Sequence, residues 1–183
     1  YEHNWKKHSG MQNSFHHWQN KLPLYNMRLQ NLSAAIIRPQ VPELASRVEK
    51  GRTNHDYVAD LLNASPWLDV PPPLAPELRA PDSIQFNLVG FENDDEARAF
   101  QDAAKARGVA VQIFGLSADN ARAFWNWQFL GGAADLPQTR AMLMRACDVR
   151  LPVRLTVEEL DFIAEALIGA AAEAKTEPRA YGT

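Results

Sequence analysis

The helix signals between two apolar stretches, at residues 83–91 and 109–114, constrain the fold most. Asn93 can cap this helix, and Glu96 stands three residues later, where a capping box places its second member. Gly108 follows the last turn, the usual position of a glycine that ends a helix. Each apolar stretch has the length and residue pattern of a strand. The sequence therefore predicts a strand–helix–strand unit.

The C-terminal part continues the alternation of strands and helices. It predicts a helix at 137–146, a short strand at 148–152 and a last helix at 156–174. Thr156 and Glu159 form a second capping box at the start of that last helix. We expect an α/β fold class, specifically a small α+β domain whose mixed or antiparallel sheet of about three strands is covered by helices.

Composition divides the chain into five segments. Residues 1–25 are an arm rich in aromatic residues and histidine, which needs another surface to cover it. Linking helices occupy 26–63, and prolines make 64–82 an irregular crossover. The small α+β domain is expected at 83–174, and a disordered tail at 175–183.

The linking segment predicts two helices, at 26–38 and 42–63. Pro39 removes a backbone hydrogen bond and ends the first helix near its own position. Pro42 suits the first turn of the second helix. Gly51 is a point where the second helix can break.

Charge and residue types exclude several classes of protein. The 183 residues carry a formal net charge of -3, which does not favour nucleic acid or an anionic membrane. No apolar run approaches the roughly 20 residues of a membrane span. One cysteine, Cys147, cannot form an internal disulfide, which indicates a cytoplasmic protein. The spacing of His3, His8, His16 and His17 matches no strong zinc pattern, so no metal site is expected.

Several short motifs occur in a particular order. Residues 24–35 read Leu-Tyr-Asn-Met-Arg-Leu-Gln-Asn-Leu-Ser-Ala-Ala, and Gln40 follows. Further on come Leu136-Pro137, Leu151-Pro152 and Thr-Val-Glu-Glu-Leu at 156–160. With the strand–helix–strand unit, this series resembles the DegT/DnrJ/EryC1/StrS aminotransferases over residues 22–174. The resemblance implies the C-terminal part of a fold-type I enzyme that uses pyridoxal 5′-phosphate (PLP).

The resemblance implies transfer of an amino group from an amino-acid donor to a keto sugar or related carbonyl compound, as a biosynthetic step. The large domain that carries the cofactor lysine has no counterpart here, so no catalytic residue is assigned and the chain alone is expected to be inactive. It would be a C-terminal fragment or one half of a split enzyme, with the large domain or a companion chain as partner, and a homodimer when whole. Lys21, seven residues after Ser14, does not fit the family's spacing for a cofactor lysine.

By this resemblance, Asn26 and Arg28 contact the PLP phosphate of a neighbouring subunit. An amide donor and a guanidinium both suit a phosphate. The alternatives are a helix cap for Asn26 and a surface ion pair for Arg28. Leu24 replaces the glycine that is usual two residues before this asparagine, so the turn must differ.

Aromatic and histidine side chains are the candidates for the substrate side of the pocket. His16, His17 and Trp18 belong to the arm, where an aromatic interface cluster is the alternative. Trp125 and Trp127 lie after the second strand, where the family commonly has a histidine-bearing loop. Their rings can stack on a sugar or aryl group, and core packing is the alternative.

Arginines near the end of the domain are candidates for binding the donor carboxylate. Arg140, Arg145 and Arg150 each offer a planar fork that pairs with a carboxylate, and exposed surface arginines are the alternative. Cys147 has no histidine near it in sequence, which favours packing over nucleophilic chemistry.

Two other functions compete with transamination. The first is a non-enzymatic module that binds a partner through the aromatic arm and the loop of Trp125 and Trp127. The second is a small-molecule sensing domain of ferredoxin-like shape, which fits the order of elements but has no ligand motif.

Overall fold

The computed structural model describes residues 31–117, 120, 122–126 and 134–176. The chain divides into two units, Tyr1–Pro42 and Glu43–Thr183. The first unit contains α3 (Asn31–Ile37) and most of the 3-10 helix η1 (Arg38–Glu43), neither of which has a buried residue. The arm predicted at 1–25 and most of the tail lie outside the described residues, and the segment boundaries stay a prediction.

Pro39 marks the end of the first helix correctly, whereas the start of the second helix and the effect of Gly51 differ from expectation. α3 ends at Ile37, two residues before Pro39, as predicted. Pro42 lies in η1, and the next helix, α4 (Leu44–Asn63), starts two residues later than predicted. α4 runs through Gly51 without a break, so that expectation was wrong.

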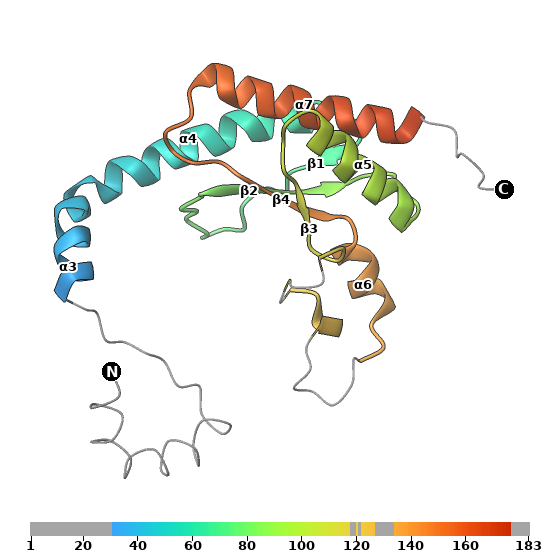
Figure 1. Cartoon of the computed structure of the whole chain (residues 1–183), viewed down its shortest axis with the longest axis horizontal. Helices are drawn as coiled ribbons and strands as arrows, with labels where there is room; N and C mark the ends of the chain where they lie inside the picture. The colour runs from blue at the N-terminus through green and yellow to red at the C-terminus, as the bar shows by residue number, and fades with distance from the viewer. Residues whose placement is uncertain (1–30, 118–119, 121, 127–133, 177–183) are drawn as a thin grey trace, which may run out of the picture. The chain divides into compact units, whose positions relative to one another are not determined.

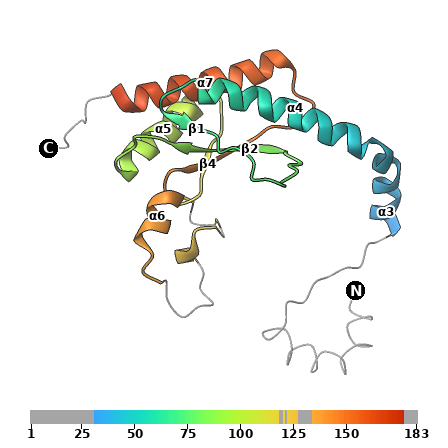
Figure 2. The ribbon, with the colours of Figure 1, turned by 180° about the vertical axis from the view of Figure 1, so that it is seen from behind.

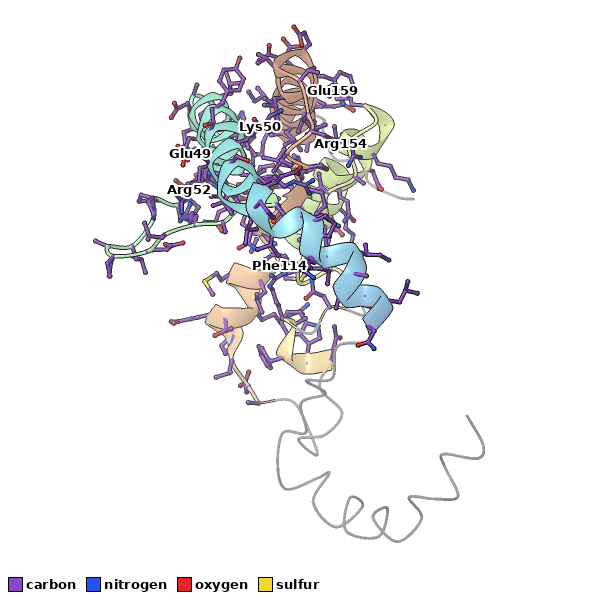
Figure 3. All side chains as sticks on the ribbon, turned by 90° about the vertical axis from the view of Figure 1, so that its left-hand side faces the viewer. Glu49, Lys50, Arg52, Phe114, Arg154 and Glu159 are labelled. Carbon is purple, nitrogen blue, oxygen red and sulfur yellow. The ribbon has the colours of Figure 1, made fainter. Side chains whose placement is uncertain are left out.

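Gly51 is required for a close approach of two segments. It is buried, and a Cβ atom at this position would lie 2.7 Å from the carbonyl oxygen of Pro81. The proline-rich segment thus crosses α4 at this point. Arg52, the next residue on α4, donates from Nε to the carbonyl oxygen of Arg79 at 2.6 Å and fixes the same crossing (Figure 3).

The sheet has four antiparallel strands in the order β1-β2-β4-β3. Their bounds are β1 (Leu68–Asp69), β2 (Ser83–Leu88), β3 (Gln112–Ile113) and β4 (Ala146–Arg150). β2 and β4 form the central pair, in which Phe86 lies opposite Cys147. β1 was not predicted, because two residues between a helix and a proline run carry no strand pattern.

Three helices cover one face of this sheet: α4, α5 (Asp94–Ala106) and α7 (Val157–Thr176) (Figures 1 and 2). Side chains of β2 and β4 alternate between this buried face and a more exposed one. The largest fully buried side chains include Phe86, Phe100 and Leu167. α6 (Pro137–Leu143) and the short η2 (Phe124–Asn126) lie in the connection between β3 and β4. The predicted fold class is confirmed.

Both predicted capping boxes are present. Asn93 Oδ1 accepts from the backbone N–H of Glu96 at 2.9 Å, and Gly108 has a φ of 89°, which glycine adopts readily. At the start of α7, Thr156 N–H donates to the Glu159 carboxylate at 2.9 Å, and Thr156 Oγ1 accepts from Glu159 N–H at 3.3 Å. These local signals therefore fixed where α5 and α7 begin.

Candidate functional site

In the connection between β3 and α6, the described residues are held by polar groups of the same segment. The side-chain amide of Asn126 donates to the carbonyl oxygens of Ser117 at 3.0 Å and Asn120 at 3.1 Å. Asn120 Oδ1 in turn accepts from the backbone N–H of Arg122 at 2.8 Å. Gly115 packs on Met144, since a Cβ there would lie 2.9 Å from the Met144 nitrogen. The described residues of this loop, at 114–117, 120 and 122–126, therefore form a platform, and Gly115 joins it to Met144 at the end of α6.

Trp125 is the predicted substrate residue that the structure describes on this platform. Its indole is half-buried and meets the Phe124 ring edge-on, with ring centroids 5.1 Å apart. The guanidinium of Arg140 on α6 lies 4.9 Å from the indole centroid, within the range of a cation–π contact. The structure thus brings together one predicted ring and one predicted arginine.

The three candidate carboxylate-binding arginines all have acidic partners within the chain. Arg140 and Arg145 both pair with Asp94, at 3.4 Å and 3.1 Å. Arg145 is only 16% exposed and also donates from Nε to the Phe91 carbonyl oxygen at 2.9 Å. Arg150 pairs with Asp82 at 2.5 Å, at an exposed position. A donor carboxylate would have to compete with these partners.

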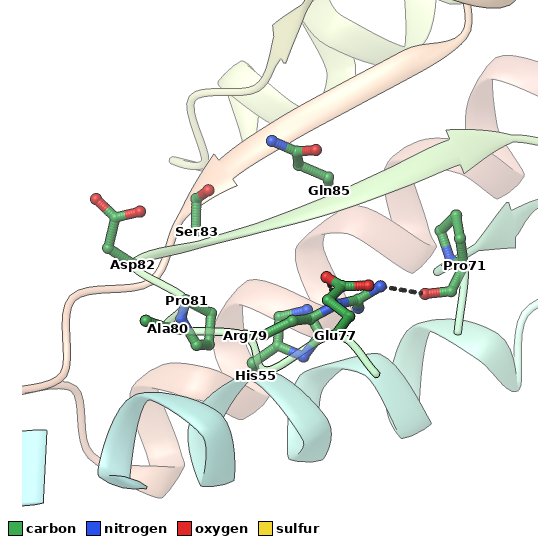
Figure 4. A pocket seen from close by; sticks show the side chains of 9 residues that line it. All are labelled: His55, Pro71, Glu77, Arg79, Ala80, Pro81, Asp82, Ser83 and Gln85. Atoms are coloured by element: carbon green, nitrogen blue, oxygen red, sulfur yellow. Dashed lines mark hydrogen bonds and ion pairs between the residues drawn. The ribbon is translucent and has the colours of Figure 1, made fainter. Parts of the chain in front are cut away.

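A hollow of about 390 Å³ lies between α4 and the proline-rich crossover (Figure 4). Its lining includes His55, which is buried, the exposed Glu77 and the half-buried Arg79. Arg79 donates to the Glu77 carboxylate at 2.8 Å and to the Pro71 carbonyl oxygen at 3.2 Å. The hydrogen bond from Arg79, followed by that from the Leu74 N–H, holds the pKa of Glu77 below its usual range. Sequence reasoning missed this hollow, because its charged residues lie in a segment that reads as a linker.

The other predicted site residues lie outside the described residues. They are Asn26 and Arg28 for the cofactor, and His16, His17, Trp18 and Trp127 for the substrate. Within the described ranges, no three histidine, cysteine or acidic residues are grouped so that they could hold a metal ion. The helices in those ranges also include none with the length and apolarity needed to cross a membrane.

Comparison with known families decides the classification. The sequence model of the DegT/DnrJ/EryC1/StrS aminotransferase family matches residues 4–168. The chain belongs to this family. The resemblance seen in the order of motifs is thereby confirmed. A comparison with curated protein sequences gave no significant match.

Solved aminotransferase structures share the fold. TlmJ from Streptoalloteichus hindustanus is 16% identical, with a TM-score of 0.65 over 79% of this chain and 37% of its own. 3-Amino-5-hydroxybenzoic acid synthase is 19% identical, with a TM-score of 0.65 over 84% of this chain and 41% of its own. The sugar aminotransferase CalS13 from Micromonospora echinospora is 14% identical, with a TM-score of 0.63 over 79% of this chain and 36% of its own. The chain thus spans about two fifths of the length of these aminotransferases.

The lysines among the described residues are Lys50, Lys105 and Lys175. Lys50 and Lys105 are exposed on helices (Figure 3 labels Lys50). Lys175 is 15% exposed, but its Nζ donates to the Gly90 carbonyl oxygen at 2.7 Å and pairs with Glu96 at 3.1 Å. Neither the hollow beside His55 nor one beside Gln112 and Asp148 is lined by a lysine. The described lysines are therefore either exposed on helices or engaged by polar partners.

Cys147 is expected to be unreactive in this aminotransferase-family chain. Burial raises the pKa of its thiol, and the neighbouring Asp148 carboxylate raises it further, so the reactive thiolate is scarce at neutral pH. We expect Ellman's reagent to react at least about 100-fold more slowly with the native chain than with the chain in concentrated urea. Fast reaction at equal rates in both conditions would contradict the buried position.

Proposed function

We propose that this chain is the C-terminal part of a PLP-dependent aminotransferase that moves an amino group from an amino-acid donor to a keto sugar or related carbonyl compound. The observation that carries the proposal is the family match over residues 4–168. It favours transamination over a non-enzymatic module or a sensing domain. The fold shared with the sugar aminotransferase CalS13 is consistent with a keto-sugar acceptor.

The cofactor is held mainly by a large domain, on the same polypeptide or on a companion chain. The described lysines support this proposal, since Lys175 pairs with Glu96 and the other two lie on exposed helical surface. Asn26 and Arg28 contribute contacts to the PLP phosphate, by donating from an amide and a guanidinium. The chain alone is inactive, because it supplies neither the lysine nor most of the contacts to the cofactor.

The small domain contributes to the substrate side. Trp125 offers an indole face on a platform tied by Asn126, a surface on which a sugar or aryl ring can stack. Trp127 and the arm residues His16, His17 and Trp18 complete this side in the whole enzyme. Sugar rings present apolar C–H faces, which aromatic side chains bind without needing charge.

The whole enzyme is a cytoplasmic homodimer. Support for the dimer comes from α3 and η1, where four large apolar side chains are exposed: Leu32, Ile36, Ile37 and Val41. Leu32 is 71% exposed, and the helix that carries it has no buried residue. An apolar face of this kind needs a covering surface, and a second subunit with its large domain supplies one.

The test is an amination assay with a nucleotide-linked keto sugar and glutamate, in which the amino sugar is detected by mass spectrometry. The chain alone, with PLP added, is expected to give no product. The chain together with a family large domain, supplied upstream on the same polypeptide, is expected to give product. Product formation by the chain alone would contradict the proposal that a large domain supplies the lysine and most contacts to PLP.

A further inference from the structure

We propose that the ion pair between Asp94 and Arg140 sets the orientation of the Trp125 indole. Arg140 is then a positioning residue for substrate binding, not the residue that binds the donor carboxylate. The inference rests on the proposed function through the substrate role of Trp125. Three segments meet in this contact: the first turn of α5, the middle of α6, and η2.

Asp94 is the fixed point of the contact. It is the first residue of α5, where the helix dipole favours a negative charge. Its Oδ1 accepts from Arg145 at 3.1 Å, and Arg145 is itself held by the carbonyl oxygens of Phe91 at 2.9 Å and Met144 at 3.1 Å. Oδ1 of Asp94 is thus bonded to the largely buried Arg145, while Oδ2 faces Arg140.

Arg140 contacts both Asp94 and the Trp125 ring. One of its terminal nitrogens donates to Asp94 Oδ2 at 3.4 Å, while its guanidinium carbon lies 4.9 Å from the Trp125 centroid. A planar guanidinium can pair with a carboxylate through its edge and stack on an aromatic ring through its face at the same time. The ion pair is half-exposed, so it adds little to the stability of the fold. Its main effect is to hold the Arg140 guanidinium, and with it the Trp125 indole, in one orientation.

The loop backbone is held separately from the ring. Asn126 ties the carbonyl oxygens of Ser117 and Asn120, and these bonds do not involve Arg140. Rotation of the Trp125 side chain is limited by Phe124 on one side and Arg140 on another. Removal of Arg140 is therefore expected to leave the bonds of Asn126 in place and to remove one of the two described contacts of the indole.

The direct test is nuclear magnetic resonance of the 183-residue chain with ¹⁵N-labelled tryptophan. The Trp125 indole N–H signal is assigned by its loss in Trp125→Phe. Arg140→Ala and Asp94→Asn are each expected to shift this signal. Arg150→Ala is the matched control, because Arg150 is an exposed arginine with an acidic partner, Asp82, and no ring among its described contacts. An unchanged Trp125 signal in both Arg140→Ala and Asp94→Asn overturns the inference.

A kinetic arm in the whole enzyme separates this inference from the proposed function. Arg140→Ala is expected to raise KM for the keto substrate about two- to fivefold, the loss of one exposed cation–π contact, with kcat and the KM for the amino donor unchanged. A raised KM for the donor instead would identify Arg140 as the carboxylate-binding residue and overturn the positioning role. A shifted indole signal together with an unaltered KM in Trp125→Ala would instead refute the substrate role proposed for Trp125.

Discussion

Replacement of Phe100 by alanine is expected to lower the free energy of unfolding by about 3 to 5 kcal/mol. Phe100 lies on α5, is 0% exposed, and meets the rings of Phe86 and Phe91 edge-on, each at a centroid distance of 6.2 Å. The substitution removes these contacts and leaves a cavity between helix and sheet that rigid neighbours cannot fill. Urea denaturation followed by far-ultraviolet circular dichroism measures the loss.

Phe162→Ala is the control for this prediction. Phe162 lies on α7 and is 55% exposed, so its truncation is expected to change stability by no more than about 0.5 kcal/mol. The comparison keeps the residue type and the size of the deletion constant and changes only burial. Equal losses for Phe100→Ala and Phe162→Ala would contradict the position of the core.

Gly51→Ala is expected to destabilise the chain by about 1 to 3 kcal/mol, against the usual effect of alanine in a helix. In an exposed helix interior, this change would stabilise by up to about 1 kcal/mol. Here the new methyl group would lie 2.7 Å from the Pro81 carbonyl oxygen, a backbone atom that can move only with the crossover. The same urea titration measures the effect.

Gly169→Ala on α7 is the matched variant. A Cβ at Gly169 would lie 3.2 Å from Nε of Arg107, a side-chain atom whose guanidinium also bonds the Ala103 carbonyl oxygen and Glu173, so a shift of a few tenths of an ångström relieves the contact without moving the backbone. We therefore expect no loss of stability at Gly169, because the gain in helix propensity is not opposed by a backbone clash. A stabilising Gly51→Ala would show that the crossover does not press on α4.

The features that the sequence predicted correctly depend on local interactions. The capping pairs Asn93 with Glu96 and Thr156 with Glu159 lie within one turn, so residue type and spacing suffice to place them. The same holds for Pro39, which ends α3 through its own missing N–H. Alternation along β2 also reports its buried face directly, since every second side chain enters the core.

The features that could not be predicted depend on contacts between distant segments. From the sequence alone, Gly51 is a residue that can break a helix. Its role in the close contact between α4 and Pro81 is visible only once the two segments are packed together. β1 exists only because Leu68 and Asp69 pair with β2. The contact of Arg140 with Asp94 joins residues 46 positions apart, so neither partner can be recognised from its own neighbourhood.

The central claim is that this chain belongs to an aminotransferase whose cofactor lysine lies elsewhere. The most direct measurement is to incubate the chain with PLP, reduce it with borohydride and locate any pyridoxyl group by peptide mass spectrometry. We predict no stoichiometric adduct at any lysine of this chain, and labelling of a single lysine of the large domain when that domain is present. A stoichiometric adduct at one lysine of this chain, such as Lys21, would contradict the claim.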